Sequence, residues 1–318
     1  MLTIPGYSIA RQIHDGRRSL IFQGTREIDN LPVIIKTLKN KFPSLAESLG
    51  FQQEYSILQN AGSHGIVRAY AMETIQNVSM IIMEDFGGIS LDKSPHIEKL
   101  SLPELLTLFI RIPGILDEIH HQSIVHKDIN STNIVWNPDT GQVKVIDFGI
   151  SSKISKGKTD LLSADEFQGT VAYISPEQTG RMNRSLDFRT DLYSLGVTFY
   201  ELLTRQRPFT ASDSMELVYA HFAKTPVPPG DIKSDIPKVL SNIILKLLAK
   251  MPEHRYQSAI GLKADLETCL ANLETDGTIK FFKIGQKDIS DQFCISQKLY
   301  NRGNDIQSLL VVYDRISL

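Results

Sequence analysis

Two polar stretches, His126-Lys127-Asp128-Ile129-Asn130-Ser131-Thr132-Asn133 and Asp147-Phe148-Gly149, decide the fold of this chain. Between them, residues 134–136 and 143–146 are apolar enough for two short strands, and residues 137–141 carry the Pro and Gly of a turn. The sequence therefore predicts a hairpin that joins the end of the first stretch to the start of the second.

This hairpin would bring together three side chains that suit phosphate chemistry. Asn133 and Asp147 lie at its open end, and Asp128 lies on the loop that approaches it. Mg²⁺ prefers oxygen ligands and keeps several waters, so an Asp and an Asn beside substrate phosphates would hold it well. A nearby Asp that is free of metal can accept a proton from a hydroxyl group.

The pattern resembles the eukaryotic-type protein kinase family, which carries these residue types in this order and approximate spacing. The resemblance covers about residues 7 to 272. It implies an α+β, bilobal protein-kinase fold, with a small β-rich N-lobe that has one main helix and a larger, mostly helical C-lobe. The implied divisions are 1–86 for the N-lobe, 87–273 for the C-lobe, and 274–318 for a linker and the start of a truncated ATPase-like domain.

The resemblance also implies a reaction, in which ATP donates its γ-phosphoryl group to a Ser or Thr hydroxyl of a protein substrate. Asp128 would accept the hydroxyl proton, and Asn133 and Asp147 would hold Mg²⁺. Lys36, at the end of an apolar strand, would bind the α- and β-phosphates of ATP.

Lys36 needs an anionic partner, and residues 44–60, which are expected to be helical, offer two glutamates. Glu54 is preferred over Glu47 because Leu58 follows it at i+4 on the same helix face, as in the kinase family. Glu54 would then orient Lys36 toward the phosphates.

The nucleotide would contact several strands and the connector between the lobes. By the resemblance, Met83 is the gatekeeper, and the carbonyl of Glu84 and the N–H of Phe86 face adenine. The implied nucleotide-binding residues are Ile13, Gly16, Ile21, Ile34, Lys36, Met83, Glu84, Phe86, Val135 and Asp147.

The sequence departs from the family pattern in three places. The glycines of the phosphate loop correspond to His14, Gly16 and Ser19, so only the middle one is present. Ile34 replaces an alanine and crowds the adenine slot. Asn130 stands where most Ser/Thr kinases carry a lysine that touches the transferring phosphate, and this change is expected to lower the rate or alter the acceptor preference. The other two departures affect the nucleotide. We expect weakened nucleotide binding rather than an inactive site, since each lost neutral hydrogen bond costs about 1 kcal/mol.

Residues further along the chain complete the pattern. The resemblance implies that Glu177 is buried and paired with Arg255, and that Asp191 holds the backbone of the catalytic loop. Residues 150–168 are polar and suit a loop that could be phosphorylated, with Lys127 as a source of positive charge. The candidate acceptors are Ser151, Ser152, Ser155, Thr159 and Ser163.

Two local patterns make structural predictions. Ser101-Leu102-Pro103-Glu104 predicts a capped helix start, and Pro113-Gly114 predicts a kink in that helix or its division into two. His126 is expected to be a core histidine that hydrogen-bonds to backbone and packs under Phe148.

Composition excludes several classes of protein. The net charge of −2 gives no argument for nucleic acid or an anionic membrane, and two cysteines support neither a disulfide framework nor a zinc site. No apolar run reaches the roughly 18 residues of a membrane span, and the N-terminus lacks the pattern of a signal peptide. We expect a cytoplasmic protein.

The stretch Thr179-Gly180-Arg181-Met182-Asn183-Arg184 resembles one subfamily, the N-terminal kinase modules of large bacterial signalling proteins. In these, ATPase, GAF and histidine-kinase domains follow, and such downstream domains of the same chain would be partners; the alternative is a complete kinase with a C-terminal tail. For function, the alternatives are a pseudokinase module that controls an adjacent ATPase or histidine-kinase domain, and a small-molecule phosphotransferase of the aminoglycoside-kinase type.

Overall fold

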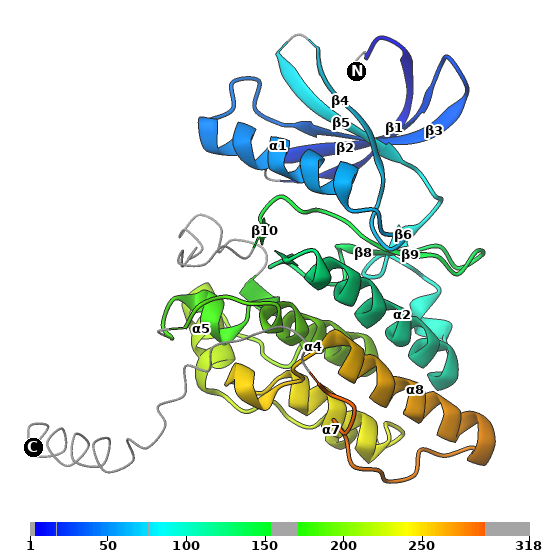
Figure 1. Ribbon diagram of the computed structural model, residues 1–318, viewed down its shortest axis with the longest axis vertical. Helices are drawn as coiled ribbons and strands as arrows, with labels where there is room; N and C mark the ends of the chain where they lie inside the picture. The colour runs from blue at the N-terminus through cyan, green and yellow to red at the C-terminus, as the bar shows by residue number, and fades with distance from the viewer. Residues whose placement is uncertain (1–3, 17, 76, 154–170, 183, 290–318) are drawn as a thin grey trace, which may run out of the picture.

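The N-terminal lobe is a five-stranded antiparallel sheet with the strand order β1-β2-β3-β5-β4, and one long helix lies beside it (Figure 1). The structure, a computed structural model, describes residues 4–16, 18–75, 77–153, 171–182 and 184–289. The elements of this lobe are β1 (Tyr7–Asp15), β2 (Ser19–Arg26), β3 (Leu31–Leu38), α1 (Leu45–Asn60), β4 (Ala69–Ile75) and β5 (Val78–Glu84).

The two faces of this sheet bury different residues because side chains alternate along a strand. On β3, Val33 and Ile35 are fully buried and join one apolar cluster, whereas Ile34 packs toward the cluster that contains α1. Lys36 shares the face of Ile34, two residues along the strand. The period of two therefore directs Lys36 toward α1.

The C-terminal lobe is mostly helical, as predicted (Figure 1). Its helices are α2 (Leu102–His121), α4 (Arg189–Thr204), α5 (Ser214–Ala223), α6 (Pro229–Ile232), α7 (Lys238–Leu247) and α8 (Ala259–Asp276), with 3₁₀ turns at Ile97–Lys99, Val171–Tyr173, Pro176–Thr179 and Pro252–His254. Nearly every residue of α4 is buried, which identifies it as the central helix of this lobe.

Short strands lie between the two lobes. β6 (Ile89–Ser90), β8 (Ile134–Trp136) and β9 (Val143–Val145) form one sheet, and β7 (Ile124–Val125) pairs with β10 (Ser152–Lys153). β8 and β9 are the predicted hairpin, with Ile134 opposite Val145. The bilobal fold is thus confirmed.

Helix α2 begins with the predicted capping box of Ser101 and Glu104, but it is not divided at Pro113. It continues as one helix to His121, so of the two predicted outcomes the division into two helices is wrong. Pro113 is buried within the core-facing surface of α2, and Phe109 stacks on Phe199 of α4 with ring centroids 3.9 Å apart. Packing of this apolar face outweighs the hydrogen bond that proline cannot donate.

The chain beyond α8 folds back onto the C-lobe through Asp288, whose side chain is 5% exposed. Its carboxylate accepts hydrogen bonds from the backbone N–H groups of Gln257 and Ser258, at 2.9 and 3.0 Å. Ser258 is also the N-cap of α8. Asp288 therefore fixes the returning chain at the start of α8.

Among the described helices, none has the length and apolar character needed to cross a membrane.

Candidate active site

Lys36 and Glu54 form a buried ion pair between β3 and α1. The ammonium lies 2.7 and 2.8 Å from the two carboxylate oxygens, and the residues are 6% and 2% exposed. Oδ1 of Asp147 approaches the same ammonium at 3.0 Å. Three segments far apart in the sequence thus meet at one cation.

Glu47, the rival partner for Lys36, has a different position. It forms the capping box of α1 with Ser44, whose backbone N–H donates to the Glu47 carboxylate at 2.8 Å. The choice of Glu54 over Glu47 as the contact of Lys36 is confirmed by this geometry.

The loop that carries Asp128 is anchored from below by Asp191, at the start of α4. The backbone N–H groups of His126 and Lys127 donate to its two carboxylate oxygens at 2.9 and 2.7 Å. His120 of α2 also contacts Asp191, at 2.9 Å. Lys127 has φ +68°, a left-handed conformation that is uncommon outside glycine and that these bonds hold in place.

Asp128 and Asn133 are directly hydrogen-bonded. Nδ2 of Asn133 donates to Oδ2 and to the backbone carbonyl of Asp128, each at 2.9 Å. Nδ2 of Asn130 donates to the other carboxylate oxygen, Oδ1, at 2.8 Å. Both oxygens of Asp128 therefore accept from an amide. The role of Asn130 was not predicted, because the sequence shows only that a lysine is absent there.

Asp147 follows the hairpin in a left-handed conformation, with φ +65°. Its side chain is 42% exposed, and the backbone N–H of Ile146 donates to the carbonyl of Asn133 at 2.9 Å. Asn133 and Asp147 are therefore at the same end of the hairpin, as predicted. The next residue, Phe148, packs edge-on against His126 at 4.7 Å between ring centroids, and His126 Nε2 contacts the carbonyl of Ile146 at 3.0 Å.

The charged side chains of this cluster, together with their burial, shift one another's pKa values. Burial raises the pKa of Glu54 to about 6, although the ammonium of Lys36 opposes the shift. Burial would lower the pKa of Lys36, but the carboxylates of Asp147 and Glu54 outweigh it and raise that pKa above its usual value. For Asp147, burial favours a higher pKa, but the nearby Lys36 holds it below its usual value. At neutral pH, one ammonium is shared by two carboxylates.

The oxygens of Asn133 and Asp147 fit a magnesium ion. Among the described residues, none donates a hydrogen bond to Oδ2 of Asp147. The amide nitrogen of Asn133 donates to Asp128, so the amide oxygen points elsewhere; within the described part of the chain, its one hydrogen bond is a long one, 3.4 Å, from Oγ1 of Thr132. One carboxylate and one amide oxygen are a donor set suited to Mg²⁺ with additional water or phosphate ligands.

The residues expected to bind the nucleotide come from the strands around Lys36. Ile21 lies opposite Lys36, and Ile34 lies opposite Met83, in the antiparallel registers of β2, β3 and β5. Gly16 occupies the β1–β2 turn, where an added Cβ would lie 2.9 Å from the His14 ring. Of the remaining members, Ile13 is 38% exposed on β1, whereas Val135 on β8 is buried.

The connector between the lobes is fixed by contacts that sequence reasoning missed. The buried Lys144 of β9 forms an ion pair with Glu84, and the backbone N–H of Arg68 donates to the same carboxylate oxygen at 2.7 Å. The carbonyl of Phe86 accepts from Nδ2 of Asn137 at 2.7 Å. The one available signal was that Lys144 is the charged member of an otherwise apolar strand.

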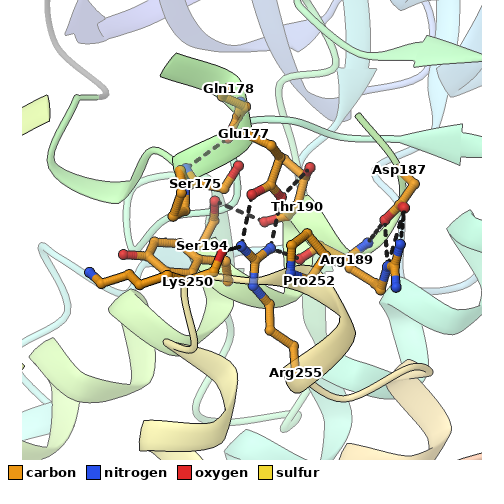
Figure 2. Close-up of polar contacts among 12 residues, drawn as sticks. Ser175, Glu177, Gln178, Asp187, Arg189, Thr190, Ser194, Lys250, Pro252 and Arg255 are labelled. Carbon is orange, nitrogen blue, oxygen red and sulfur yellow. Dashed lines mark hydrogen bonds and ion pairs between the residues drawn. The ribbon is translucent and has the colours of Figure 1, made fainter. Parts of the chain in front are cut away.

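Glu177 and Arg255 form the second buried ion pair, as expected (Figure 2). The guanidinium donates to Oε1 and Oε2 of Glu177 at 2.7 Å each. Its remaining N–H groups donate to the backbone carbonyls of Ala249, Arg189 and Lys250. All five donors of Arg255 are therefore used.

The five candidate phosphorylation sites differ in whether they fall within the described residues. Ser155, Thr159 and Ser163 lie outside the described residues, and only the backbone of Ser152 is described, in β10. Ser151 is buried and its hydroxyl donates to the carbonyl of His126 at 3.2 Å, so it is not accessible in this conformation.

Comparison with known proteins agrees with this geometry. Residues 7–265 match the family described as protein kinase domain. The chain is 30% identical over 272 residues to a probable serine/threonine-protein kinase of Clostridium acetobutylicum, covering 85% of this chain and 41% of that protein. It is 35% identical over 187 residues to the serine/threonine-protein kinase PknB of Mycobacterium tuberculosis, covering 58% and 29%.

A third relative is the hybrid signal transduction histidine kinase G of Dictyostelium discoideum, 42% identical over 168 residues, which are 46% of this chain and 5% of that protein. The chain thus spans less than half the length of each of these curated relatives. The family match nevertheless extends over most of its residues. The chain belongs to the protein kinase family.

Proposed function

We propose that this protein is an ATP-dependent serine/threonine protein kinase. The observation that carries the proposal is the meeting of Lys36, Glu54 and Asp147, because a cation held between two carboxylates is poised to bind phosphate oxygens. The serine/threonine-kinase relatives support the same activity.

Each side chain would have one task in the transfer of the γ-phosphoryl group of ATP. Lys36, oriented by Glu54, would bind the α- and β-phosphates. Asp128, held by its two amide donors, would orient the acceptor hydroxyl and take its proton. A magnesium ion held by Asn133 and Asp147 would neutralise phosphate charge. Positioning and charge stabilisation would supply most of the rate acceleration.

The nucleotide set named above would contact ATP with weaker affinity than in most kinases, because Ile34 is larger than alanine and only Gly16 remains of the three glycines. The pair of Glu177 and Arg255 supports a protein substrate, since it fixes the end of the segment on which a polypeptide would lie. The complete set of Asp128, Asn133 and Asp147 supports an enzyme rather than a pseudokinase module.

We further propose that the kinase is the N-terminal module of a longer cytoplasmic signalling protein, with lobes that divide near residue 86. The similarity to a hybrid histidine kinase supports this arrangement. The proposed use of ATP as phosphoryl donor supports a cytoplasmic location. The downstream domains of the same chain would then be partners.

The test is transfer of ³²P from Mg-ATP to a generic protein substrate, followed by phosphoamino acid analysis. The wild-type protein is expected to label Ser and Thr, and Asp147→Asn to lose nearly all transfer. Asp139→Asn is the matched control, because the same substitution falls at the exposed turn of the same hairpin. Equal labelling by wild type and Asp147→Asn, or none by either, would contradict the proposal.

A further inference from the structure

Asn130 occupies the position where the family usually has lysine, yet it is 4% exposed and fully hydrogen-bonded. Its amide nitrogen donates to Oδ1 of Asp128 at 2.8 Å and to the Asp128 carbonyl at 3.2 Å. Its amide oxygen accepts from the backbone N–H and the hydroxyl of Thr132, at 2.8 and 2.6 Å, and from the N–H of Asn133 at 3.2 Å.

These partners fix which way the amide points. Two backbone N–H groups require an acceptor, so the oxygen must face Thr132 and Asn133, and the nitrogen must then face the carboxylate of Asp128. A lysine has no acceptor and could not close this turn. Asn130 therefore does something different from the residue it replaces.

Resting on the proposed kinase activity, we propose that Asn130 is the positioning residue of Asp128. Asn133 holds Oδ2 and Asn130 holds Oδ1, so the carboxylate is clamped from both sides by neutral donors. A neutral clamp orients the proton acceptor without placing a cation beside the transferring phosphate. The contribution of Asn130 is thus orientation of Asp128, and the charge at the phosphate must come from other groups.

Asn130→Asp tests this contact sharply. The new carboxylate keeps the acceptor for Thr132 and Asn133, but it places a second anionic oxygen about one hydrogen-bond length from Asp128. Two carboxylates this close share a proton, which raises the apparent pKa of the pair. We expect kcat at pH 7 to fall about tenfold or more and to recover as the pH rises, since each unit of pKa shift changes the ionised fraction up to about tenfold.

The matched control is Asn40→Asp. Asn40 closes a similar turn by accepting from the N–H of Phe42 at 2.9 Å, but it is exposed and lies outside the proposed catalytic and nucleotide-binding residues. Its kcat–pH curve is expected to keep the wild-type shape. An active wild-type protein together with an unshifted curve for Asn130→Asp would overturn the inference and leave the proposed function intact.

A second readout does not depend on activity. Because the folded Asn130→Asp variant would hold an extra proton, its melting temperature relative to wild type should rise as the pH falls from 8 to 5. If the melting temperature shows no such pH dependence, the inference is overturned, whether or not the wild-type protein is active. An inactive wild-type protein would instead contradict the proposed function.

If Asn130→Asp does not fold, Asn130→Ser takes its place. Serine can still accept from the N–H of Thr132, but it is too short to reach Asp128. We expect a folded protein whose kcat is lower by a factor of about five, the equivalent of one lost hydrogen bond. Wild-type kcat in folded Asn130→Ser would contradict the positioning role.

Discussion

The two buried ion pairs of this protein differ in how completely their cations are satisfied. Arg255 donates to both oxygens of Glu177 and to three backbone carbonyls, and Thr190 adds a further bond to Glu177 at 2.9 Å. Lys36 instead faces Glu54 and the partly exposed Asp147. One pair is closed to any further ligand, whereas the other borders a site.

The pKa values of the two glutamates express this difference. For Glu177, burial favours a higher pKa, but Arg255 outweighs it and holds the value below normal. For Glu54, burial prevails and the pKa rises to about 6. The fully hydrogen-bonded Arg255 thus keeps Glu177 ionised. The pair of Lys36 and Glu54 is less completely hydrogen-bonded and leaves Lys36 available to a phosphate. The difference teaches that burial alone does not separate a structural ion pair from a functional one.

The largest expected effect comes from breaking the closed pair. Glu177→Gln should lower the free energy of unfolding by about 3–5 kcal/mol, because Arg255 cannot lose its proton and would remain as an uncompensated buried charge. Chemical denaturation measures this change. Glu253→Gln is the control, since that glutamate pairs with Arg184 at a partly exposed position. Similar stability losses in the two variants would show that Glu177 is not special.

Breaking the open pair should affect activity more than stability. Lys36→Met is expected to lower phosphate transfer by about 10²–10³-fold, the usual cost of removing one electrostatic contact to the reacting group. Its loss of unfolding free energy should be smaller than that of Glu177→Gln, because Glu54 can become neutral. Steady-state kinetics and denaturation of the same preparation check both statements. A stability loss as large as that of Glu177→Gln would remove the distinction between the pairs.

The pH should separate the two glutamates further. The folded pKa of Glu54 rises from 4.5 to about 6, so the folded protein binds more protons between these values. Its contribution to stability therefore increases as the pH falls through this window, by at most about 2 kcal/mol. Activity should decline over the same window, because a neutral Glu54 holds Lys36 less firmly.

Activity and melting temperature measured from pH 5 to 8 test this opposition. Glu54→Gln should have lower activity than wild type at every pH. Its activity should not show the decline near pH 6. A decline that persists unchanged in that variant would assign it to another group.

The smallest effect is expected at Glu47, the glutamate that only caps α1. Glu47→Ala should cost about 0.3–1.5 kcal/mol, the usual value of one capping interaction, and change phosphate transfer less than twofold. Thermal denaturation and the kinase assay measure the two quantities. A large loss of activity would mean that the cap of α1, and not only Glu54, controls the position of Lys36.

The resemblance to the kinase family was sufficient for the fold and for the contacts of Lys36, Glu54 and Asp191, because so many matching residues rarely occur in the family's order and spacing by chance. It was insufficient where a contact depends on local geometry. Asn130 is recognisable only as a missing lysine until the turn that directs its amide is seen. The pair of Glu84 and Lys144 joins residues from different sheets, which no periodicity reports. At Pro113, tertiary packing overrode the local preference.

Asp288 has a consequence for any shortened version of the chain. The family match ends at residue 265 and α8 ends at Asp276, but Asp288 lies beyond both and satisfies backbone donors at the start of α8. The neighbouring Gln257 donates to the carbonyl of Arg255 at 2.9 Å. A protein cut at residue 276 would therefore lose Asp288, and the backbone N–H groups of Gln257 and Ser258, which begin two residues after Arg255, would lose that acceptor.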